Sequence, residues 1–435
     1  MSMKPLISKI ENREDILTFT LSGVDVSVAN SIRRGILADI NTVAFITTPN
    51  EENRATIYTN TTRLNNEILK QRLSCIPIHI TDVPLEDLDQ LVLELNEENL
   101  TDTMYTVTTE HFKIRHKKTN TYLSEKDVRQ IFPPFQAPNG VNYFIQFVRL
   151  RPKISDDIPG EKISLTCDFK TCCSKKNSMF NVVGTCAYGF TVDENAGKME
   201  LAKKQQQWKS ENMDEVSYES ESKNWMLLEA KRFVIKDSFD FIIQTVGVFE
   251  NDSIIRFACQ SLINKFVVLL NQILKGKLQV STEFETSNPD TYDYVLENED
   301  YTIGNILNHL LYTNYYEGYK LISYVGFKKR HPHDLDSMIR MTYLNPGEDE
   351  THELGITYIK ECCTEAIQII RDIMDKFGGN LHQIGYNPPI EQEDVEKQAL
   401  PQEEHKSPDY APNSPANYSP DYAPNSPVSI DSDGN

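Results

Sequence analysis

The sequence predicts an α+β fold with two related half-domains, a mostly β insertion domain and an acidic, disordered C-terminal tail. The prediction of two half-domains rests on two helix-opening segments, Asn30–Leu37 and Glu299–Leu307. Each follows a segment with the pattern of a strand and begins an amphipathic helix. A third observation is the change in composition beyond about residue 386. Two unequal halves on one chain suggest a dimer made covalent, which favours a scaffold over a catalyst.

The composition is that of an acidic globular protein. The chain has 435 residues, of which 39% are hydrophobic, and a formal net charge of −20. Roughly three domains are typical of this length. Such an acidic surface repels DNA phosphates, so we expect protein partners rather than direct duplex binding by the whole chain.

The cysteines and apolar runs bear on the cellular compartment. The eight cysteines are sparse, as in reduced intracellular proteins. The N-terminal segment lacks the apolar stretch of a secretory signal. The longest apolar run, Phe266–Leu270, is too short to span a bilayer. We therefore expect a soluble protein of the cytosol or nucleus, with no membrane contact.

The first half begins with a strand and a helix. The segment Ile16–Leu21 alternates in polarity, which predicts a half-buried strand. Asp25 or Ser27 is then placed to cap a helix. Arg33 and Arg34 face away from the apolar stripe of this helix, which is formed by Val28, Ile32 and Ile36.

The middle of the chain is predicted to be mostly β. Before it, Asn60–Ile78 has the pattern of a helix that stops at Pro77. Strands are predicted at Tyr143–Leu150 and Phe180–Gly184. The polar stretch Lys203–Lys223 is predicted to be a loop.

Strand and helix then recur. A strand is predicted at Ser238–Val246, and Asn251 or Asp252 is expected to cap a long helix. One continuous apolar face of that helix is formed by Ile255, Ala258, Leu262, Phe266, Leu269 and Ile273.

The second half repeats this order. A strand is predicted at Tyr292–Glu297, followed by a helix with Thr302 as N-cap. Its buried stripe is Ile303, Ile306, Leu307, Leu310 and Leu311. Strands are predicted at Tyr319–Phe327 and Ser337–Tyr343. A last helix, ended by Gly378, has an apolar face of Cys363, Ala366, Ile370, Ile373 and Phe377.

The tail contains the duplicated segments Ser407–Pro415 and Ser419–Pro427. Its prolines and charge preclude a packed core, so we expect disorder. A solubilising tail is favoured. A testable alternative is phosphorylation at the serines that precede proline, Ser407, Ser414, Ser419 and Ser426.

Several motifs in this order resemble a known family. The first helix-opening segment resembles the third subunit of eukaryotic RNA polymerase II, whose family includes the archaeal D and L proteins and the bacterial alpha N-terminal domain. The resemblance continues through Asn60-Thr61-Thr62, Leu64, Glu67, Arg72-Leu73 and Ile76-Pro77-Ile78. Arg149–Pro152 and Pro159–Glu161 resemble that family's insertion domain.

The second half resembles the eleventh subunit of the same polymerase, whose archaeal counterpart is the L protein. The similar residues are the second helix-opening segment, Gly318-Tyr319 and Gly326–His333. The chain departs from that pattern at Tyr301, where histidine is usual, and by an extra basic residue before His331.

The resemblance implies a fusion of subunits that are normally separate chains, which suggests a large DNA virus with its own polymerase. The implied domains are residues 1–48 plus 225–275, an insertion over 49–224, a second half over 280–380 and a tail over 386–435. Localisation would be the virion and host cytoplasm if the protein is viral, and otherwise the nucleus.

The implied function is a non-catalytic assembly platform of a DNA-directed RNA polymerase, which holds the second-largest and then the largest subunit. Small zinc-binding subunits are implied neighbours, and DNA contact is indirect. Intramolecular dimerisation is expected to use Ile32, Ile36, Leu262, Phe266, Leu269, Ile306, Leu307, Leu310, Ile370 and Ile373. The alternative is a stand-alone interaction module or regulator that binds polymerase subunits.

Arg33 and Arg34 are the best candidates for a partner interface, because the family's helix faces the second-largest subunit and arginine suits such interfaces. The simpler interpretation is a solvated helix face. Asn30 belongs to the same candidate surface, although local backbone bonding is the more common use of asparagine. Gly304 is expected to permit a close helix approach.

No catalytic constellation or cofactor is predicted. The chain lacks a phosphate-binding loop, HExxH, GxSxG and an acidic triplet for magnesium. Cys167, Cys172, Cys173 and Cys186 lack the paired knuckles of a zinc site, so buried thiols are favoured. His331, His333, Asp334 and Asp336 fit a structural turn better than a metal site. The basic run Lys113–Lys118 fits a charged strand edge better than a phosphate contact.

Overall fold

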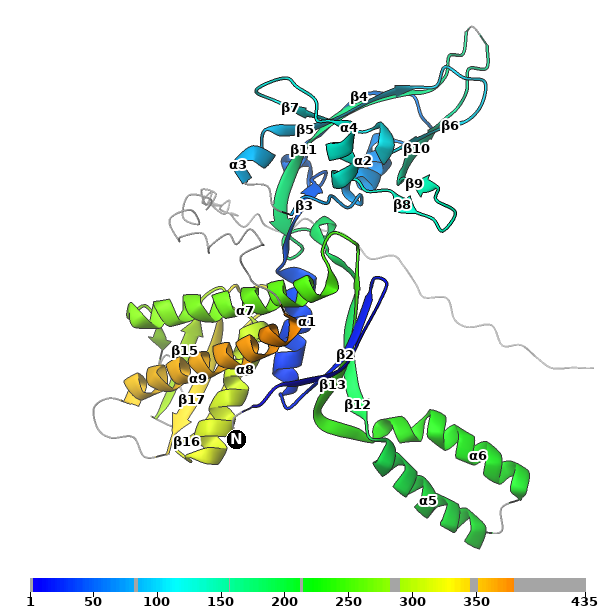
Figure 1. Ribbon diagram of the computed structural model, residues 1–435. Helices are drawn as coiled ribbons and strands as arrows, with labels where there is room; N and C mark the ends of the chain where they lie inside the picture. The colour runs from blue at the N-terminus through cyan, green and yellow to red at the C-terminus, as the bar shows by residue number, and fades with distance from the viewer. Residues whose placement is uncertain are drawn as a thin grey trace, which may run out of the picture. The chain divides into compact units, whose positions relative to one another are not determined.

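Figure 1 shows a computed structural model of the protein, which describes residues 3–81, 85–155, 157–211, 214–281, 290–344 and 351–378. The tail over 386–435, with its four candidate phosphorylation sites, lies outside the described residues. Helices and strands are mixed along the described chain, as in the predicted α+β class.

Four antiparallel strands form the first sheet, in the order β1-β2-β13-β12. Their bounds are β1 Leu6–Arg13, β2 Ile16–Ser22, β13 Val234–Thr245 and β12 Val183–Val192. Two helices pack against this sheet, α1 Val26–Ala38 and α7 Asn251–Leu274. The alternation that predicted β2 places Leu17, Phe19 and Leu21 in the core.

A second sheet has the order β14-β15-β17-β16. Its strands are β14 Val280–Ser281, β15 Thr291–Leu296, β17 Ser337–Tyr343 and β16 Ile322–Lys328. Its helices are α8 Tyr301–Leu311, a π-helical turn Tyr312–Gly318, α9 Thr351–Met374 and a 3-10 turn Asp375–Phe377.

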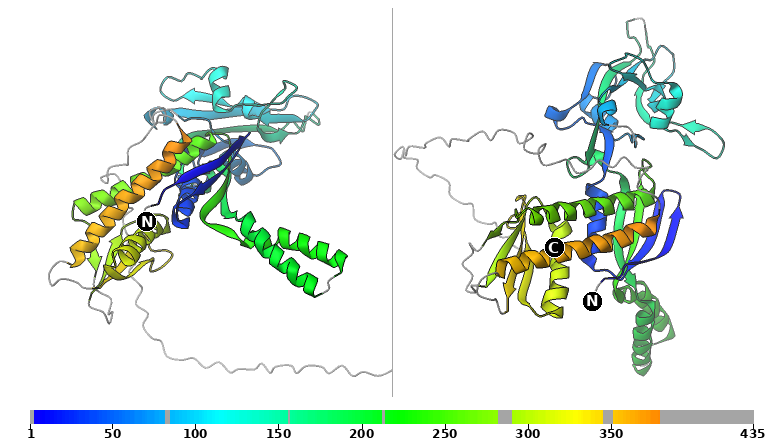
Figure 2. Two further views of the ribbon diagram at one scale, coloured as in Figure 1. Left: turned by 60° about the horizontal axis from the view of Figure 1, so that its bottom comes forward. Right: turned by 60° about the vertical axis from the view of Figure 1, so that its left-hand side comes forward.

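One hydrophobic core joins these two sheets with their helices. α7 packs along α9, and α1 packs along α8; Figures 1 and 2 show α7 and α9 side by side. All ten residues proposed for intramolecular dimerisation are buried in this core. Among the described residues, α7 alone is long and apolar enough to cross a membrane. Its packing in the core accounts for that apolar character.

Residues 43–169 build a separate hydrophobic core. Its central strand, β11 Lys162–Cys173, pairs with three others: β3 Asn41–Phe45, β4 Ala55–Asn60 and β5 Leu91–Glu98. The other elements are β6 Tyr105–Thr108, β7 Lys113–His116, β8 Phe135–Gln136, β9 Asn142–Tyr143, β10 Gln146–Leu150, α2 Asn66–Ser74, α3 Leu85–Leu88 and α4 Glu125–Ile131. β12, which falls within the expected insertion of residues 49–224, instead completes the first sheet.

The loop predicted at Lys203–Lys223 is a helical hairpin, α5 Glu194–Ser210 and α6 Glu215–Leu227. Gly197 is the only buried residue described in these two helices, so the apolar periodicity used for prediction is missing. Asp193 and Asp214 cap the helices by accepting backbone hydrogen bonds. Pairs such as Glu194–Lys198 (3.3 Å) add local support. Figures 1 and 2 show the hairpin leading out from the ends of β12 and β13.

Two predicted N-caps were wrong. α7 follows Glu250, which makes no side-chain cap bond, while Asn251 donates to the carbonyl oxygen of Asp15 (3.0 Å). α8 is capped by Asp300, and Thr302 lies inside the first turn. Neighbouring polar residues compete for the same backbone N–H groups, and tertiary contacts decide the outcome.

Two other predicted segments are shorter than expected. The helix predicted from Asn60 is α2, which starts at Asn66 because Asn60 ends β4 and Asn65 caps the helix. The strand predicted from Tyr143 is interrupted before β10 begins at Gln146.

Candidate functional site

The candidate site lies along α1 and α8, whose first turns are built alike. Asp25 caps α1 by accepting from the backbone N–H of Ser27 (2.8 Å). Asp300 caps α8 by accepting from the backbone N–H of Thr302, also at 2.8 Å. When the helices are aligned by these caps, Ser27 matches Thr302, and Asn30 matches Asn305.

One basic residue of each helix lies next to the aspartate that caps the other helix. Arg34 of α1 donates to the carboxylate of Asp300 (2.8 Å) and to the hydroxyl of Thr302 (2.9 Å). At the opposite end, Nδ1 of His309 on α8 lies 3.5 Å from Asp25 Oδ1. Arg34 and His309 stand at the same position relative to their own caps. The helices are therefore antiparallel and related by an approximate two-fold exchange of contacts, as in an isologous interface.

Further polar contacts fix this junction. The hydroxyl of Ser31 lies within hydrogen-bond distance of two carbonyl oxygens, those of Ser27 (2.6 Å) and Thr302 (2.5 Å), and its single proton is shared between a bond within α1 and a bond to α8. At the C-terminal end of α1, Lys265 of α7 pairs with the C-cap residue Asp39 at 2.7 Å. Lys265 and Asp39 form the better shielded of the two ion pairs, whereas the Arg34 side chain is more exposed and solvent screens its pair with Asp300.

Burial and charge shift two acidic groups at the junction in opposite directions. Burial opposes ionisation of Asp300, but hydrogen bonds from Thr302 and the charge of Arg34 outweigh it and lower the pKa of this carboxyl. Burial raises the pKa of the neighbouring Glu299 to about 7, although Lys265 opposes the shift. Glu299 is therefore a candidate for a neutral carboxyl at the junction near neutral pH.

The three candidate interface residues have different surroundings. Arg34 is engaged by the second half of the same chain, as described above. Arg33 donates from Nε and Nη2 to Asn30 Oδ1 (3.1 and 2.9 Å). Asn30 therefore bonds a side chain rather than the local backbone, which corrects the expectation for this residue. Asn30 and Arg33 are both partly exposed, and Arg33 lies close enough to β12 for its charge to act on Cys186 and Tyr188.

A hollow of about 330 Å³ opens beside Asn30, between the start of α1 and the end of α8. Its lining is almost entirely polar or aromatic: Asp25, Val26, Ser27, Asn30, Tyr188, Asn305, Asn308, His309 and Tyr312. Sequence reasoning missed Asp25, Ser27, Asn308 and His309 as site residues. The signal that could have found them is the shared spacing of the two helix openings after an aspartate.

One glycine on each of these two helices faces a neighbouring element of the core. A Cβ on Gly304 would lie 2.0 Å from the ring of Phe327, so this glycine admits an aromatic ring of β16 rather than a helix. A Cβ on Gly35 would meet Ala258 of α7 at 3.4 Å, which is ordinary contact. A side chain is therefore tolerated less well at position 304 than at position 35.

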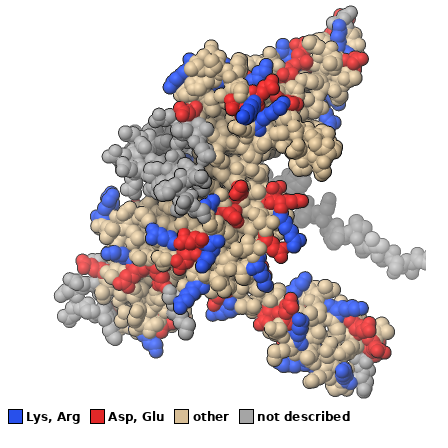
Figure 3. All heavy atoms as spheres, in the orientation of Figure 1, with Lys and Arg blue, Asp and Glu red and all other residues tan. Residues whose placement is uncertain are grey.

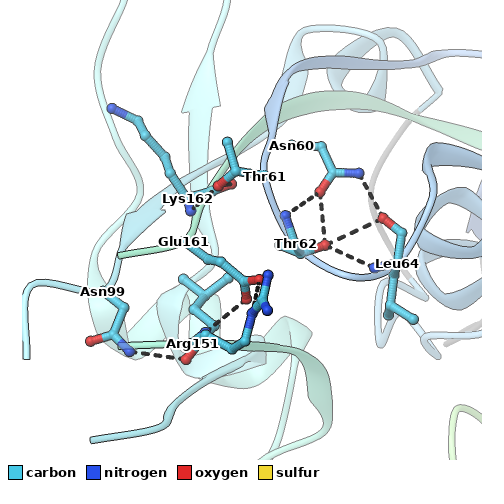
Figure 4. Close-up of polar contacts among 9 residues, drawn as sticks. Asn60, Thr61, Thr62, Leu64, Asn99, Arg151, Glu161 and Lys162 are labelled. Atoms are coloured by element: carbon cyan, nitrogen blue, oxygen red, sulfur yellow. Dashed lines mark hydrogen bonds and ion pairs between the residues drawn. The ribbon is translucent and has the colours of Figure 1, made fainter. Parts of the chain in front are cut away.

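The motif residues of the insertion serve internal bonds (Figure 4). Asn60 Oδ1 accepts from the backbone N–H and hydroxyl of Thr62 (3.0 and 2.7 Å) and fixes a turn. Buried Glu161 accepts from Nε and the backbone N–H of Arg151 (2.5 and 2.7 Å). These side chains bond to groups of the insertion itself. Their role is therefore to hold the shape of this domain rather than to form a binding site.

The alternative metal and nucleic-acid sites have little support. Among the described residues, no group of three or more His, Cys, Asp or Glu side chains could hold a metal ion. Cys167 and Cys186 are free and buried in different sheets, and burial raises the pKa of Cys186 to about 12. In the His331 loop, Asp334 accepts from the His331 backbone N–H (2.9 Å), as in a turn.

The basic run Lys113–Lys118 is partly neutralised. Arg115 pairs with Glu94 (2.6 Å), and Lys117 pairs with Asp168 (2.9 Å). On the face drawn in Figure 3, acidic and basic side chains are interspersed rather than gathered into one basic patch. This distribution does not favour phosphate binding.

Comparison with known proteins covers α1, and the matched range ends before α8. Residues 18–266 match the family described as the RNA polymerase Rpb3/Rpb11 dimerisation domain. DNA-directed RNA polymerase subunit Rpo3 of Pyrococcus furiosus is 38% identical over 85 residues, which are 20% of this chain and 30% of the relative. DNA-directed RNA polymerases I and III subunit RPAC1 of Homo sapiens is 38% identical over 66 residues, 15% of this chain and 17% of the relative. The chain thus spans less than a third of the length of these relatives.

Proposed function

The chain belongs to the family of the RNA polymerase Rpb3/Rpb11 dimerisation domain, and from this premise we propose that it is a non-catalytic assembly subunit of a multisubunit DNA-directed RNA polymerase. The reciprocal pairing of α1 with α8 carries the proposal. A dimerisation domain needs a partner for its apolar helices, and here one hydrophobic core contains both sets. The chain therefore supplies its own partner.

In this proposal the fold is an intramolecular pseudo-heterodimer. Residues 1–48 and 225–275, with β12, act as the third-subunit-like half, and residues 280–380 act as the eleventh-subunit-like half. A covalent link keeps the effective concentration of the second half on the order of millimolar. The fusion and a viral origin are parts of the same proposal, as is a location in virion and host cytoplasm, or in the nucleus of a cellular source.

The partly exposed part of α1 around Asn30 and Arg33 is the proposed surface for larger companions, whereas Arg34 turns to Asp300. The second-largest subunit would bind first and the largest next, with small zinc-binding subunits as neighbours and DNA held only by the complex. The chain itself would need no cofactor, because its role is to position the subunits that carry the chemistry.

A tagged full-length chain tests this function when it is expressed with the large subunits of its own polymerase. We expect stoichiometric recovery of both large subunits that survives about 1 M salt, where the screening length is about 3 Å. Arg33→Glu should reduce that recovery, and Arg13→Glu, an exposed charge reversal on β1, should not. Weak, salt-labile and substoichiometric recovery would instead favour a regulator. Failure to recover either large subunit would refute the platform.

A further inference from the structure

Three arginines line one groove of the insertion domain, which has a volume of about 470 Å³. Arg63 lies in the loop before α2, Arg72 in the last turn of that helix, and Arg149 on β10. α2 and β10 pack against each other (Figure 1). No acidic residue lines the groove, and all three arginines are exposed, so a ligand can reach them. We call this surface the arginine groove.

Two of these arginines are held beside the same residue. Arg72 donates from Nε to the carbonyl oxygen of Phe147 (2.6 Å) and from Nη2 to that of Gln146 (2.7 Å). Arg149 donates from Nη2 to the side-chain oxygen of Gln146 (3.3 Å). In a regular strand, Gln146 and Arg149 would point to opposite faces. A shift of register between Gln146 and Val148 breaks that alternation and allows the contact.

The third arginine is placed by the turn in Figure 4. Asn60 fixes this turn by accepting from Thr62, and its Nδ2 donates to the carbonyl oxygen of Leu64 (2.8 Å). The backbone on both sides of Arg63 is therefore held by hydrogen bonds. The Arg63 side chain itself makes no hydrogen bond or ion pair with the described residues.

The charge of the arginine groove is not neutralised within the described part of the chain, where none of its three arginines forms an ion pair. Arg115 and Arg151 of the same domain instead pair with Glu94 and Glu161. Like charges along one groove repel each other, so an anion that lies among them is favoured. The positive charge of this groove also stands out in a chain whose net charge is −20.

The rest of the lining is largely apolar. Leu64, Phe147 and Val148 line the groove, and the last two are buried. Met104, which is 50% exposed, lines it as well. An apolar lining suits a peptide that buries a hydrophobic side chain, whereas a nucleic-acid backbone makes its contacts through phosphates. Arginine and methionine are both enriched in protein–protein interfaces.

We infer that the arginine groove binds an extended acidic segment of a companion polypeptide. This inference rests on the proposed assembly function, which supplies the companion. Carboxylates of the segment pair with Arg63 and Arg149, because the planar guanidinium fork matches a carboxylate, and an apolar side chain of the segment covers Phe147. Arg72 holds the shape of the groove through its backbone bonds and adds its charge. Clusters of arginine recognise acidic motifs in other proteins by the same chemistry.

The probe for this inference is the peptide acetyl-Glu-Glu-Leu-Glu-Glu-amide, titrated into the full-length chain by fluorescence anisotropy of an attached dye. We expect a dissociation constant on the order of 100 μM at low salt, which weakens as salt is raised. The peptide with four Gln in place of Glu should bind at least about tenfold more weakly, and the peptide with Ser in place of Leu about threefold more weakly. Equal binding of the Glu and Gln peptides would overturn the inference.

Two variants and a control separate binding from folding. Arg63→Gln and Arg149→Gln should each weaken binding of the acidic peptide about fivefold. Both should keep the wild-type melting temperature, because neither arginine has an ion pair to lose. Arg129→Gln is the matched control, since Arg129 is an exposed arginine of the same domain that pairs with Glu110 outside this groove, and it should leave binding unchanged. Unchanged binding in Arg63→Gln and Arg149→Gln would contradict the assigned site.

Two other occupants are tested in the same assay. A thymidine decanucleotide that binds more tightly than the acidic peptide, and loses affinity in Arg63→Gln, would show a nucleic-acid site and overturn the inference. Removal of residues 387–435, the greater part of the acidic tail, should leave the affinity for the peptide unchanged. A severalfold gain in affinity would mean that the chain itself competes for the groove, which would overturn a companion as the occupant.

The pull-down connects the arginine groove to assembly. The double variant Arg63→Gln/Arg149→Gln should reduce recovery of at least one companion subunit severalfold, while Arg129→Gln should retain all of them. Full recovery with the double variant would refute the acidic segment of a companion and leave the platform function standing. If the wild-type chain recovers no companion, the platform fails, and the peptide titration still decides the chemistry of the groove.

Discussion

The contact between Arg34 and Thr302 offers a direct test of how the halves hold together. Thr302 is 3% exposed, and its hydroxyl accepts from Arg34 Nε at 2.9 Å. Arg34→Ala leaves that hydroxyl buried and unsatisfied, a cost of about 1–3 kcal/mol. The lost ion pair with Asp300 adds little, because the Arg34 side chain is 37% exposed and solvent screens it. We expect Arg34→Ala to lower the free energy of unfolding by about 2 kcal/mol.

A double-mutant cycle isolates the contact. Arg34→Ala, Thr302→Val and the double variant should show a coupling of about 1 kcal/mol, as is typical of residues in direct contact. Urea unfolding should be followed by far-ultraviolet circular dichroism, because both tryptophans, Trp208 and Trp225, lie in the α5–α6 hairpin and report on it instead. Purely additive effects would refute the claim that this bond joins the halves.

Three further predictions concern the shared core and its junction. Phe266→Ala, at a fully buried position of α7, should lower the free energy of unfolding by about 3–5 kcal/mol. Amide hydrogen exchange should then become faster in both halves together. Faster exchange in one half alone would contradict a shared core. The raised pKa of Glu299 means that its contribution to stability is full below its unfolded value of 4.5 and is lost as pH rises through about 7. Glu299→Gln should therefore be more stable than the wild type above pH 7, by at most roughly 3 kcal/mol, with no such gain near pH 4; urea titrations at both pH values check this. Gly304→Ala should cost about 1–3 kcal/mol by displacing the Phe327 ring, and Phe327→Leu should recover part of that loss in a thermal melt, whereas an unchanged melting temperature for Gly304→Ala would show that the ring yields freely.

The core helices followed from the sequence because burial leaves a periodic trace. The stripe that includes Leu262 and Phe266 on α7, and the stripe that includes Ile370 and Ile373 on α9, are buried as predicted. Each position needs only an apolar side chain at helical spacing. That spacing can be recognised in the sequence without knowing which element the helix packs against. The same criterion failed for the α5–α6 hairpin, because its helices depend on caps and local ion pairs instead of an apolar face.

The polar site was predicted less well for a different reason. Arg34 was singled out from the sequence, but its partners, Asp300 and Thr302, lie in the other half of the chain. A polar side chain can bond any of many groups, and the choice depends on which surfaces meet. The cap of α8 was misassigned for the same reason, because Asp300 serves both its own helix and Arg34.

The amino-acid sequence by itself determined the α+β class, the buried stripes and the two helix openings, because periodic burial and caps are local properties of the chain. Only the tertiary structure decided that the two openings lie antiparallel and exchange contacts through their caps. It also decided that Arg34 bonds both Asp300 and Thr302 at one end, while at the other end His309 lies near Asp25. That difference arises when two distant helices meet, since hydrogen bonding depends on distances that no local pattern encodes.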